Sequence, residues 1–134
     1  MIKELVRYIG NNTDFTVGTD LFAVSMSSDK IDECVVVKED SPGLVDGILT
    51  DYRQIPLRAY SRSAINFVWK ARDNAYTVFN LLHGRMQFDL PVIDDGYTYT
   101  CNCECRSPYY MGLDESGRRH VYVVAIDLTI TNMT

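Results

Sequence analysis

Apolar residues recur every three or four positions at the start of the chain, which predicts a short amphipathic helix over about residues 1–9. The apolar stripe of this helix consists of Ile2, Leu5, Val6 and Ile9. Gly10 and the polar residues 11–14 are expected to end it, because glycine and asparagine tolerate the left-handed conformation of a helix C-terminus.

The same spacing continues over a longer segment and predicts the main helix at about residues 62–83. Its stripe consists of Ile65, Val68, Trp69, Arg72, Ala75, Tyr76, Phe79 and Leu82. Ser61 or Ser63 can cap the helix, since a hydroxyl oxygen accepts a hydrogen bond from an unpaired amide. Gly84 follows at the position of a left-handed residue, and His83 in the last turn suits the helix dipole.

Alternation of apolar and polar residues predicts strands elsewhere in the chain. The strand segments are 20–26, 34–39, 52–61, 86–90, 97–106 and 120–131, and the loops or turns are 27–33, 40–51, 94–96 and 107–119. The first two strands are expected to form a hairpin. Pro56 places the third at a sheet edge or an irregularity, because proline donates no hydrogen bond. The pattern predicts an α+β fold, with a mixed, mostly antiparallel sheet packed against one long and one short helix.

The composition is that of a single globular domain: 134 residues, of which 46% are hydrophobic and 23% charged. The net charge of −5 offers no basic surface for wrapping DNA, although an acidic surface suits a channel through which DNA must pass. The N-terminal segment lacks the apolar centre of a signal peptide, and no apolar run approaches the ~18–20 residues of a membrane span. We therefore expect synthesis in the cytoplasm, with reduced thiols.

The segment CNCECR, residues 101–106, holds three of the four cysteines at alternate positions. Side chains two residues apart on a strand share one face at about 6.5–7 Å, which is too far for a good disulfide. A zinc site would need a further ligand, and Cys34, His83 and His120 all lack motif spacing. The favoured interpretation is that these cysteines continue an apolar strand face as small buried residues, with a metal site or a redox role as alternatives.

The sequence contains no arrangement of side chains typical of an enzyme. The two histidines have no nucleophile motif near them. The acidic pairs at 94–95 and 114–115 lie beside glycines, where turn chemistry accounts for them. Phosphate-loop and dinucleotide-binding motifs are absent. We expect no catalytic residue, no cofactor and no metal.

Two short motifs and the order of the elements resemble the tail terminator, or tail-completion, proteins of long-tailed bacteriophages, often labelled minor capsid proteins. The first motif, VFNLLHG, covers residues 78–84 at the end of the main helix. The second, PYYMGLDESGRRHVY, covers residues 108–122 and leads through a tight turn into the last strand. The resemblance extends along the chain in order and length. Pro56 and the cysteine-rich strand depart from the family pattern.

The resemblance implies a single tail-terminator-like domain over residues 1–134 that acts as a structural virion protein. Such proteins form a six-membered ring that caps the completed tail tube at its head-proximal end and joins it to the head connector. The implied partners are copies of the chain itself, the tail tube protein and the head–tail connector, with DNA only passing through the lumen. Because tyrosine and methionine are enriched at interfaces, the candidate contact residues are Tyr109, Tyr110, Met111, Asp114, Glu115, Arg118 and Arg119.

Several alternatives stay open at this point. Tyr109 and Tyr110 could merely cover the core. The chain could be another neck or head-completion component of the same assembly. A hypothesis from a different class is a metal- or thiol-dependent regulator that uses Cys101, Cys103 and Cys105.

Overall fold

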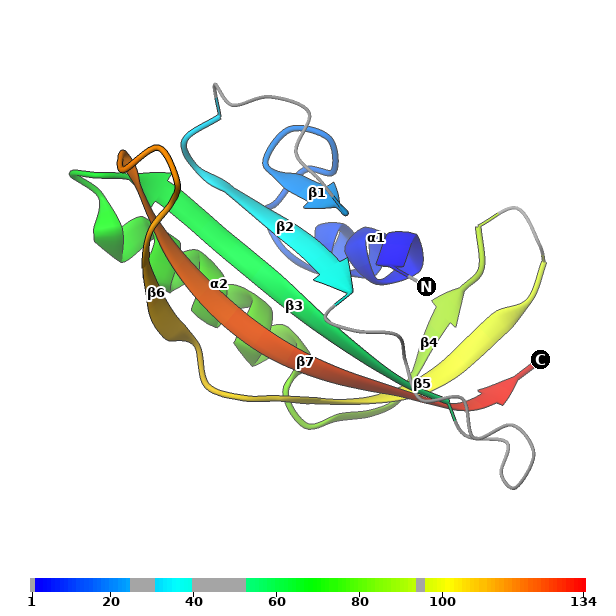
Figure 1. The fold of residues 1–134 in the computed structure, drawn as a ribbon. Helices are drawn as coiled ribbons and strands as arrows, with labels where there is room; N and C mark the ends of the chain where they lie inside the picture. The colour runs from blue at the N-terminus through cyan, green and yellow to red at the C-terminus, as the bar shows by residue number, and fades with distance from the viewer. Residues whose placement is uncertain (1, 25–30, 40–52, 94–95) are drawn as a thin grey trace.

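The computed structural model describes residues 2–24, 31–39, 53–93 and 96–134, which form two helices and a curled sheet of seven strands (Figure 1). The elements are α1 (Ile2–Asn12), β1 (Leu21–Ala23), β2 (Cys34–Glu39), β3 (Arg53–Ala64), α2 (Val68–Leu82), β4 (Arg85–Pro91), β5 (Thr98–Cys105), β6 (Tyr109–Leu113) and β7 (Arg119–Met133). The strand order is β1-β2-β3-β7-β5-β4, and β6 pairs with β7. The predicted α+β class is confirmed.

Strand β7 is the centre of the sheet. It pairs antiparallel with β3 along one side, while β5 and β6 pair with successive parts of its other side. Every pairing between the described strands is antiparallel except that of β1 with β2, so the prediction of a mixed, mostly antiparallel sheet is confirmed. Four predicted strands match the structure to within two residues at each end: 34–39, 86–90, 97–106 and 120–131.

The predicted hairpin between the first two strands is wrong. Strand β1 runs parallel to β2, with Leu21 opposite Val35. Either strand direction can place these apolar side chains in the core, so alternation in the sequence does not reveal the direction. Strand β1 also ends at Ala23, before the end of the predicted segment 20–26, whose last two residues lie outside the described part of the chain.

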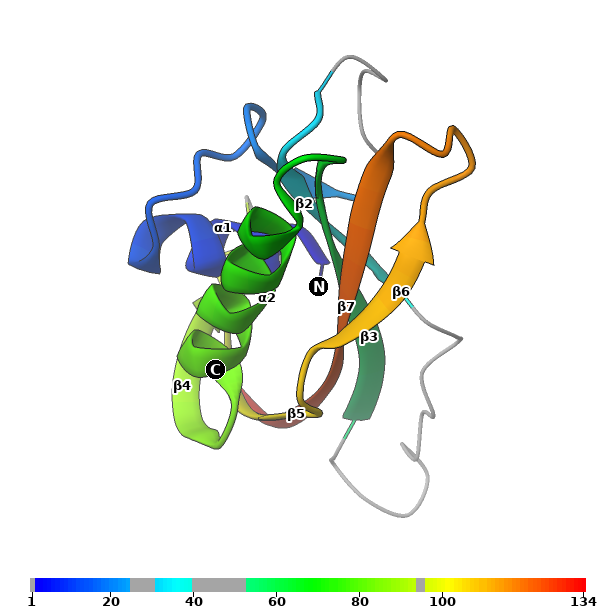
Figure 2. The same ribbon diagram turned by 90° about the vertical axis from the view of Figure 1, so that its left-hand side faces the viewer.

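Both helices lie on the same face of the sheet (Figure 2). Helix α1 contacts β1, β2 and β4, and helix α2 contacts β3, β7 and β5. The largest side chains buried between these layers include Leu5, Ile9, Leu21, Val35, Leu57, Val78, Leu82, Leu90, Ile126 and Leu128. Burial of each such side chain contributes about 1.5–3 kcal/mol. The opposite face of the sheet carries no helix among the described residues, and we call it the helix-free face.

Helix α1 confirms the predicted N-terminal helix but continues past Ile9 to Asn12. Gly10 therefore does not end it. A Cβ atom at Gly10 would lie 2.9 Å from Cγ2 of Val17, so the missing side chain lets the following loop pack against the helix. Thr13 Oγ1 then donates a hydrogen bond of 2.7 Å to the carbonyl oxygen of Ile9, which satisfies one of the last backbone acceptors.

The main helix begins later than predicted. Helix α2 starts at Val68 instead of near residue 62, because β3 continues to Ala64. Ser61 and Ser63, the expected caps, are therefore strand residues that face the helix, and Ser61 Oγ donates to a carbonyl oxygen of α2 at 2.7 Å. Strand β3 thus extends through the segment in which the two serines were expected to cap the start of the helix.

The buried stripe of α2 also differs from the predicted one. It consists of Ala71, Ala75, Val78 and Leu82. Two of these four residues are alanines, which allow the helix to approach the sheet closely. Val68 and Trp69, both predicted on the buried stripe, are 38% and 51% exposed. The predicted C-terminus is confirmed, since Gly84 follows the helix with a φ of +72°.

Residues 107–119, predicted as a loop, contain the short strand β6 and a tight turn into β7. The Gly117 amide donates to the carbonyl oxygen of Asp114 at 2.9 Å, and the φ of Gly117 is +69°, so the predicted turn is confirmed. Strand β6 was missed because it has only five residues and a bulge. Its pairing with β7 shifts register between Tyr110 and Gly112, and Gly112 has a φ of +108°.

Pro56 lies within β3 opposite Asp127 of β7. On the other side of β3, the described pairing with β2 ends one residue away, at Leu57. The prediction of an edge strand is wrong, because β3 lies between β2 and β7. The proline nevertheless falls where β3 has no described partner on the β2 side, which suits a residue that cannot donate a ladder hydrogen bond.

Three predicted connections fall wholly or partly outside the described residues. These are the whole loop at 40–51, residues 27–30 of the loop at 27–33, and two of the three residues of the turn at 94–96. Within the described ranges, neither helix is long and apolar enough to cross a bilayer.

Candidate assembly surface

A buried arginine holds the β6–β7 turn to the sheet. Arg119 is 5% exposed, and its Nε donates to Asp32 Oδ1 at 2.9 Å while its Nη1 lies 3.5 Å from Asp114 Oδ2. Ser116 Oγ donates to the second carboxylate oxygen of Asp114 at 2.6 Å. The hydrogen bond to Asp32 raises the pKa of Arg119, although burial acts in the opposite direction. The turn is thus closed by contacts within the subunit.

Asp114 is part of this internal network. Burial acts to raise its pKa, but hydrogen bonds from Ser116, the Arg118 amide and Arg119 outweigh burial and hold the pKa of Asp114 below its ordinary value. Two of the expected contact residues, Asp114 and Arg119, are therefore occupied in shaping the turn. Glu115 and Arg118 are exposed on it and remain available to a partner.

The other expected contact residues lie on β6. Tyr109, Tyr110 and Met111 are 45%, 47% and 53% exposed. Among the described strands β6 pairs only with β7, which leaves its outer edge open. The Tyr110 hydroxyl lies 2.8 Å from Nδ1 of His120, and its ring centroid lies 5.4 Å from that of Tyr122. Tyr110 therefore packs against the protein with part of its surface and presents the rest to solvent.

Both histidines have structural roles in the described chain. His120 Nε2 lies 2.9 Å from the carbonyl oxygen of Ile65, and since a carbonyl only accepts, this nitrogen carries a hydrogen. His120 thereby ties β6, through Tyr110, to the segment before α2. His83 Nδ1 accepts a hydrogen bond of 3.1 Å from the Cys105 amide.

Four large apolar side chains at the start of α2 form an exposed surface that the sequence analysis assigned to the main helix. Ile65, Phe67, Val68 and Trp69 are 49%, 41%, 38% and 51% exposed, and we call them the aromatic patch. The rings of Phe67 and Trp69 meet edge to face with centroids 5.1 Å apart. Contiguous exposed apolar surface of this kind marks interaction sites. The run FVW could have indicated it, since a one-sided helix cannot bury three consecutive apolar residues.

The two ends of the molecule expose different apolar side chains. The start of α2, which carries the aromatic patch, and the β6–β7 turn lie at one end of the molecule (Figures 1 and 2). The β4–β5 hairpin and the C-terminus lie at the other end, which we call the C-terminal tip (Figure 1). Tyr97 and Met133 at this tip are 54% and 55% exposed. Thr98 and Thr134 exchange backbone hydrogen bonds of 2.9 Å, and Met133 lies opposite Tyr99, two residues along the chain from Tyr97.

The cysteines occupy the strand face that the alternation predicts. Cys101, Cys103 and Cys105 are buried against the helix layer, and none of the four cysteines, all of which lie in the described ranges, forms a disulfide. Burial raises the pKa of Cys101 to about 12. A hydrogen bond with Cys105, together with burial, raises the pKa of Cys103 as well. Thiols in this state stay protonated at neutral pH and react poorly.

Because these thiols are buried, we expect the folded protein to lose stability at high pH. The unfolded chain releases the Cys101 proton near the ordinary pKa of 9.0, whereas the folded chain retains it up to about 12. Between these values the folded state binds more protons, so the free energy of unfolding should fall as pH rises, by about 1.4 kcal/mol per pH unit for this thiol. Urea denaturation of wild type and Cys101→Ala from pH 9.0 upward measures the slope. Parallel slopes for the two proteins would contradict the prediction.

No group of three or more His, Cys, Asp and Glu side chains in the described ranges is arranged to hold a metal ion. Neither models of protein families nor curated protein sequences match this chain.

Proposed function

We propose that the chain is a structural subunit of a bacteriophage tail, a tail terminator that caps the completed tail tube as a hexameric ring. It acts in the virion, at the head-proximal end of the tail, and is made and assembled in the cytoplasm of the host bacterium. Its partners are copies of itself, the tail tube protein and the head–tail connector. The resemblance of residues 78–84 and 108–122 to this family supplies the specific assignment.

The observation that carries the proposal is the aromatic patch. Phe67 and Trp69 are large, exposed and in contact with each other. Aromatic side chains of this kind supply most of the binding energy at protein interfaces when a partner covers them. Tyr109 and Met111 on β6 add exposed apolar area at the same end of the molecule. A protein that works by assembly needs such a surface.

The different chemistry of the two ends supports a ring in particular. A two-fold dimer brings the same patch of each subunit together, whereas a head-to-tail contact joins two different patches. The aromatic patch at one end and Tyr97 with Met133 at the other are suited to the second kind of contact. Head-to-tail contacts close into a ring when the rotation between neighbours divides a full turn.

The burial and exposure of side chains also bear on the alternative functions. A thiol- or metal-dependent regulator gains no support, because Cys101, Cys103 and Cys105 are buried. A neck or head-completion subunit would use the same exposed patches, and no feature of the described residues favours it over a terminator.

Capping of tail tubes tests the proposal. The protein should bind one end of tubes formed by the tube protein of the same genome and stop their elongation. Negative-stain electron microscopy should show one additional ring at that end. Binding to the head connector without binding to tubes would identify a neck component instead, and binding to neither would overturn the proposal.

A further inference from the structure

A cavity of about 550 Å³ opens between β2, β3 and the β6–β7 turn. Its charged lining consists of Lys38, Arg62, Arg118, Arg119, Asp114 and Glu115, and we call it the basic cavity. Arg119 is already paired with Asp32 and Asp114. The other three basic side chains form no ion pair with any described residue. A chain with a net charge of −5 thus gathers three unpaired cations in one place.

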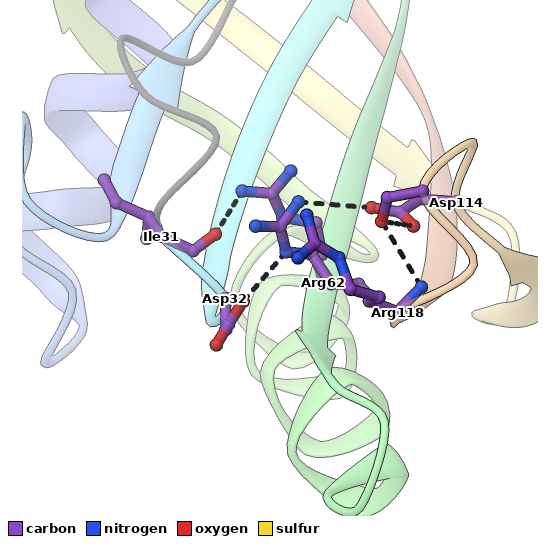
Figure 3. Close-up of polar contacts among 7 residues, drawn as sticks. Ile31, Asp32, Arg62, Asp114 and Arg118 are labelled. Atoms are coloured by element: carbon purple, nitrogen blue, oxygen red, sulfur yellow. Dashed lines mark hydrogen bonds and ion pairs between the residues drawn. The ribbon is translucent and has the colours of Figure 1, made fainter.

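Arg62 is the deepest of these cations. It is 9% exposed, and its Nη2 donates to the carbonyl oxygen of Ile31. Its Nε has no hydrogen-bond partner among the described residues. Figure 3 shows Arg62 between Ile31 on one side and Asp114 and Arg118 of the turn on the other. A buried guanidinium without a carboxylate is unfavourable, and an anion entering the cavity would offset its charge.

The helix-free face also carries an unpaired acidic pair, in the half farther from the β6–β7 turn. Glu104 of β5 lies directly opposite Asp127 of β7, and both side chains are exposed. They line a second cavity of about 370 Å³. Residues directly opposite in an antiparallel pair have Cβ atoms about 4.5–5.5 Å apart, a spacing at which like charges repel. Neither carboxylate forms an ion pair with a described residue.

We infer that the basic cavity of one copy receives Glu104 and Asp127 of a second copy. The inference rests on the proposed function only in taking the partner to be another copy of the chain. In this contact the three unpaired cations of one copy would meet the two unpaired carboxylates of the other. Guanidinium groups bind carboxylates through paired N–H donors. The contact joins two different surfaces, as the aromatic patch and the C-terminal tip also do. Complementary charges of this kind fix orientation and exclude wrong pairings.

The phosphate backbone of DNA is a less suitable occupant of the basic cavity. Asp114 and Glu115 form part of its lining and would repel a chain of phosphates. Two carboxylates bring only two negative charges to a cavity with three unpaired cations, whereas a nucleic acid brings a charge at every nucleotide along an extended path.

Reciprocal charge reversal tests this contact. The base-reversed protein carries Lys38→Glu and Arg118→Glu, and the acid-reversed protein carries Glu104→Lys and Asp127→Lys. All four side chains are exposed, so folding should be retained, which circular dichroism checks. Each variant alone should self-associate at least about tenfold more weakly than wild type in sedimentation velocity at low salt. An equal mixture of the two variants should recover association, because every contact again joins opposite charges.

Lys3→Glu and Asp14→Lys are the matched controls, since they change the charge at exposed sites elsewhere and should leave association unchanged. Wild type that stays monomeric, variants that associate like wild type, a mixture that does not recover, or binding of an oligonucleotide in place of a second copy would each overturn the inference. Tube capping, measured on the same proteins, separates the two proposals. Capping by wild type and by both variants alike leaves the proposed function standing without this contact. If the mixture recovers self-association but no protein caps tubes, the contact between copies is supported and the proposed function is not.

Discussion

Replacement of Arg119 by alanine is expected to lower the free energy of unfolding by about 2–3 kcal/mol. The Arg119 side chain is 7% exposed, and its guanidinium joins Asp32 to Asp114 across two segments that are distant in the chain. Its removal leaves the Asp114 carboxylate, whose side chain is 18% exposed, without its cation. The turn also loses its connection to the segment before β2. Chemical denaturation monitored by tryptophan fluorescence measures the change.

The neighbouring arginine is the matched control for this substitution. Arg118 is exposed and contributes only its backbone amide to the turn, donating to Ser116 Oγ at 3.3 Å. Arg118→Ala should therefore change stability by no more than about 0.5 kcal/mol. Equal losses for the two variants would show that charge alone, without burial, accounts for the effect.

The second large effect is expected from Trp69→Ser, which should weaken self-association and tube capping by about 30-fold or more. Trp69 is 51% exposed in the isolated subunit and packs edge to face against Phe67. Its large apolar surface is therefore available to a partner and contributes little to the core. Stability of the subunit should stay close to that of wild type.

Sedimentation velocity and the capping assay measure this loss, and Val17→Ser is the control. Val17 is 53% exposed but lies in the loop after α1, outside the aromatic patch. Its replacement removes exposed apolar area without touching the patch, so association should be retained. Retention of full association by Trp69→Ser would show that the patch is not a contact between copies.

Hydrophobic periodicity predicts which segments form helices or strands in this chain, and it does so because one face of each element is buried. It fails where two signals compete. At residues 61–64 the capping serines favour a helix start, but the chain continues as β3 because Leu57, Ala59 and Ser61 already face the helix layer in strand geometry. Periodicity also does not predict strand direction, because direction depends on connections far from the paired residues. It therefore did not predict that β1 pairs parallel to β2.

The candidate surface is harder to predict than the core. The expected loop residues Tyr109, Tyr110 and Met111 are exposed, because sequence composition indicates a surface segment. Arg119 was expected beside them, yet it is buried, since burial of a charged group depends on partners such as Asp32 that are 87 residues away. Ile65, Val68 and Trp69 of the aromatic patch were predicted on the buried stripe, because helical spacing places them in line with Ala75 and Leu82. Only the packing of the alanines of α2 shows which side of the helix meets the sheet.

The length of β7 has a consequence for any closed assembly of this chain. The strand runs without a break over 15 residues, from the turn near the aromatic patch to the C-terminal tip. At about 3.3 Å per residue its contour length is roughly 50 Å. This length and the bend of the strand, visible in Figure 1, together set the distance between the two ends of the subunit. Each subunit would then contribute a constant arc to the circumference. This length would fix how far apart the contact surfaces of one subunit lie, while the number of subunits would follow from the rotation between neighbours.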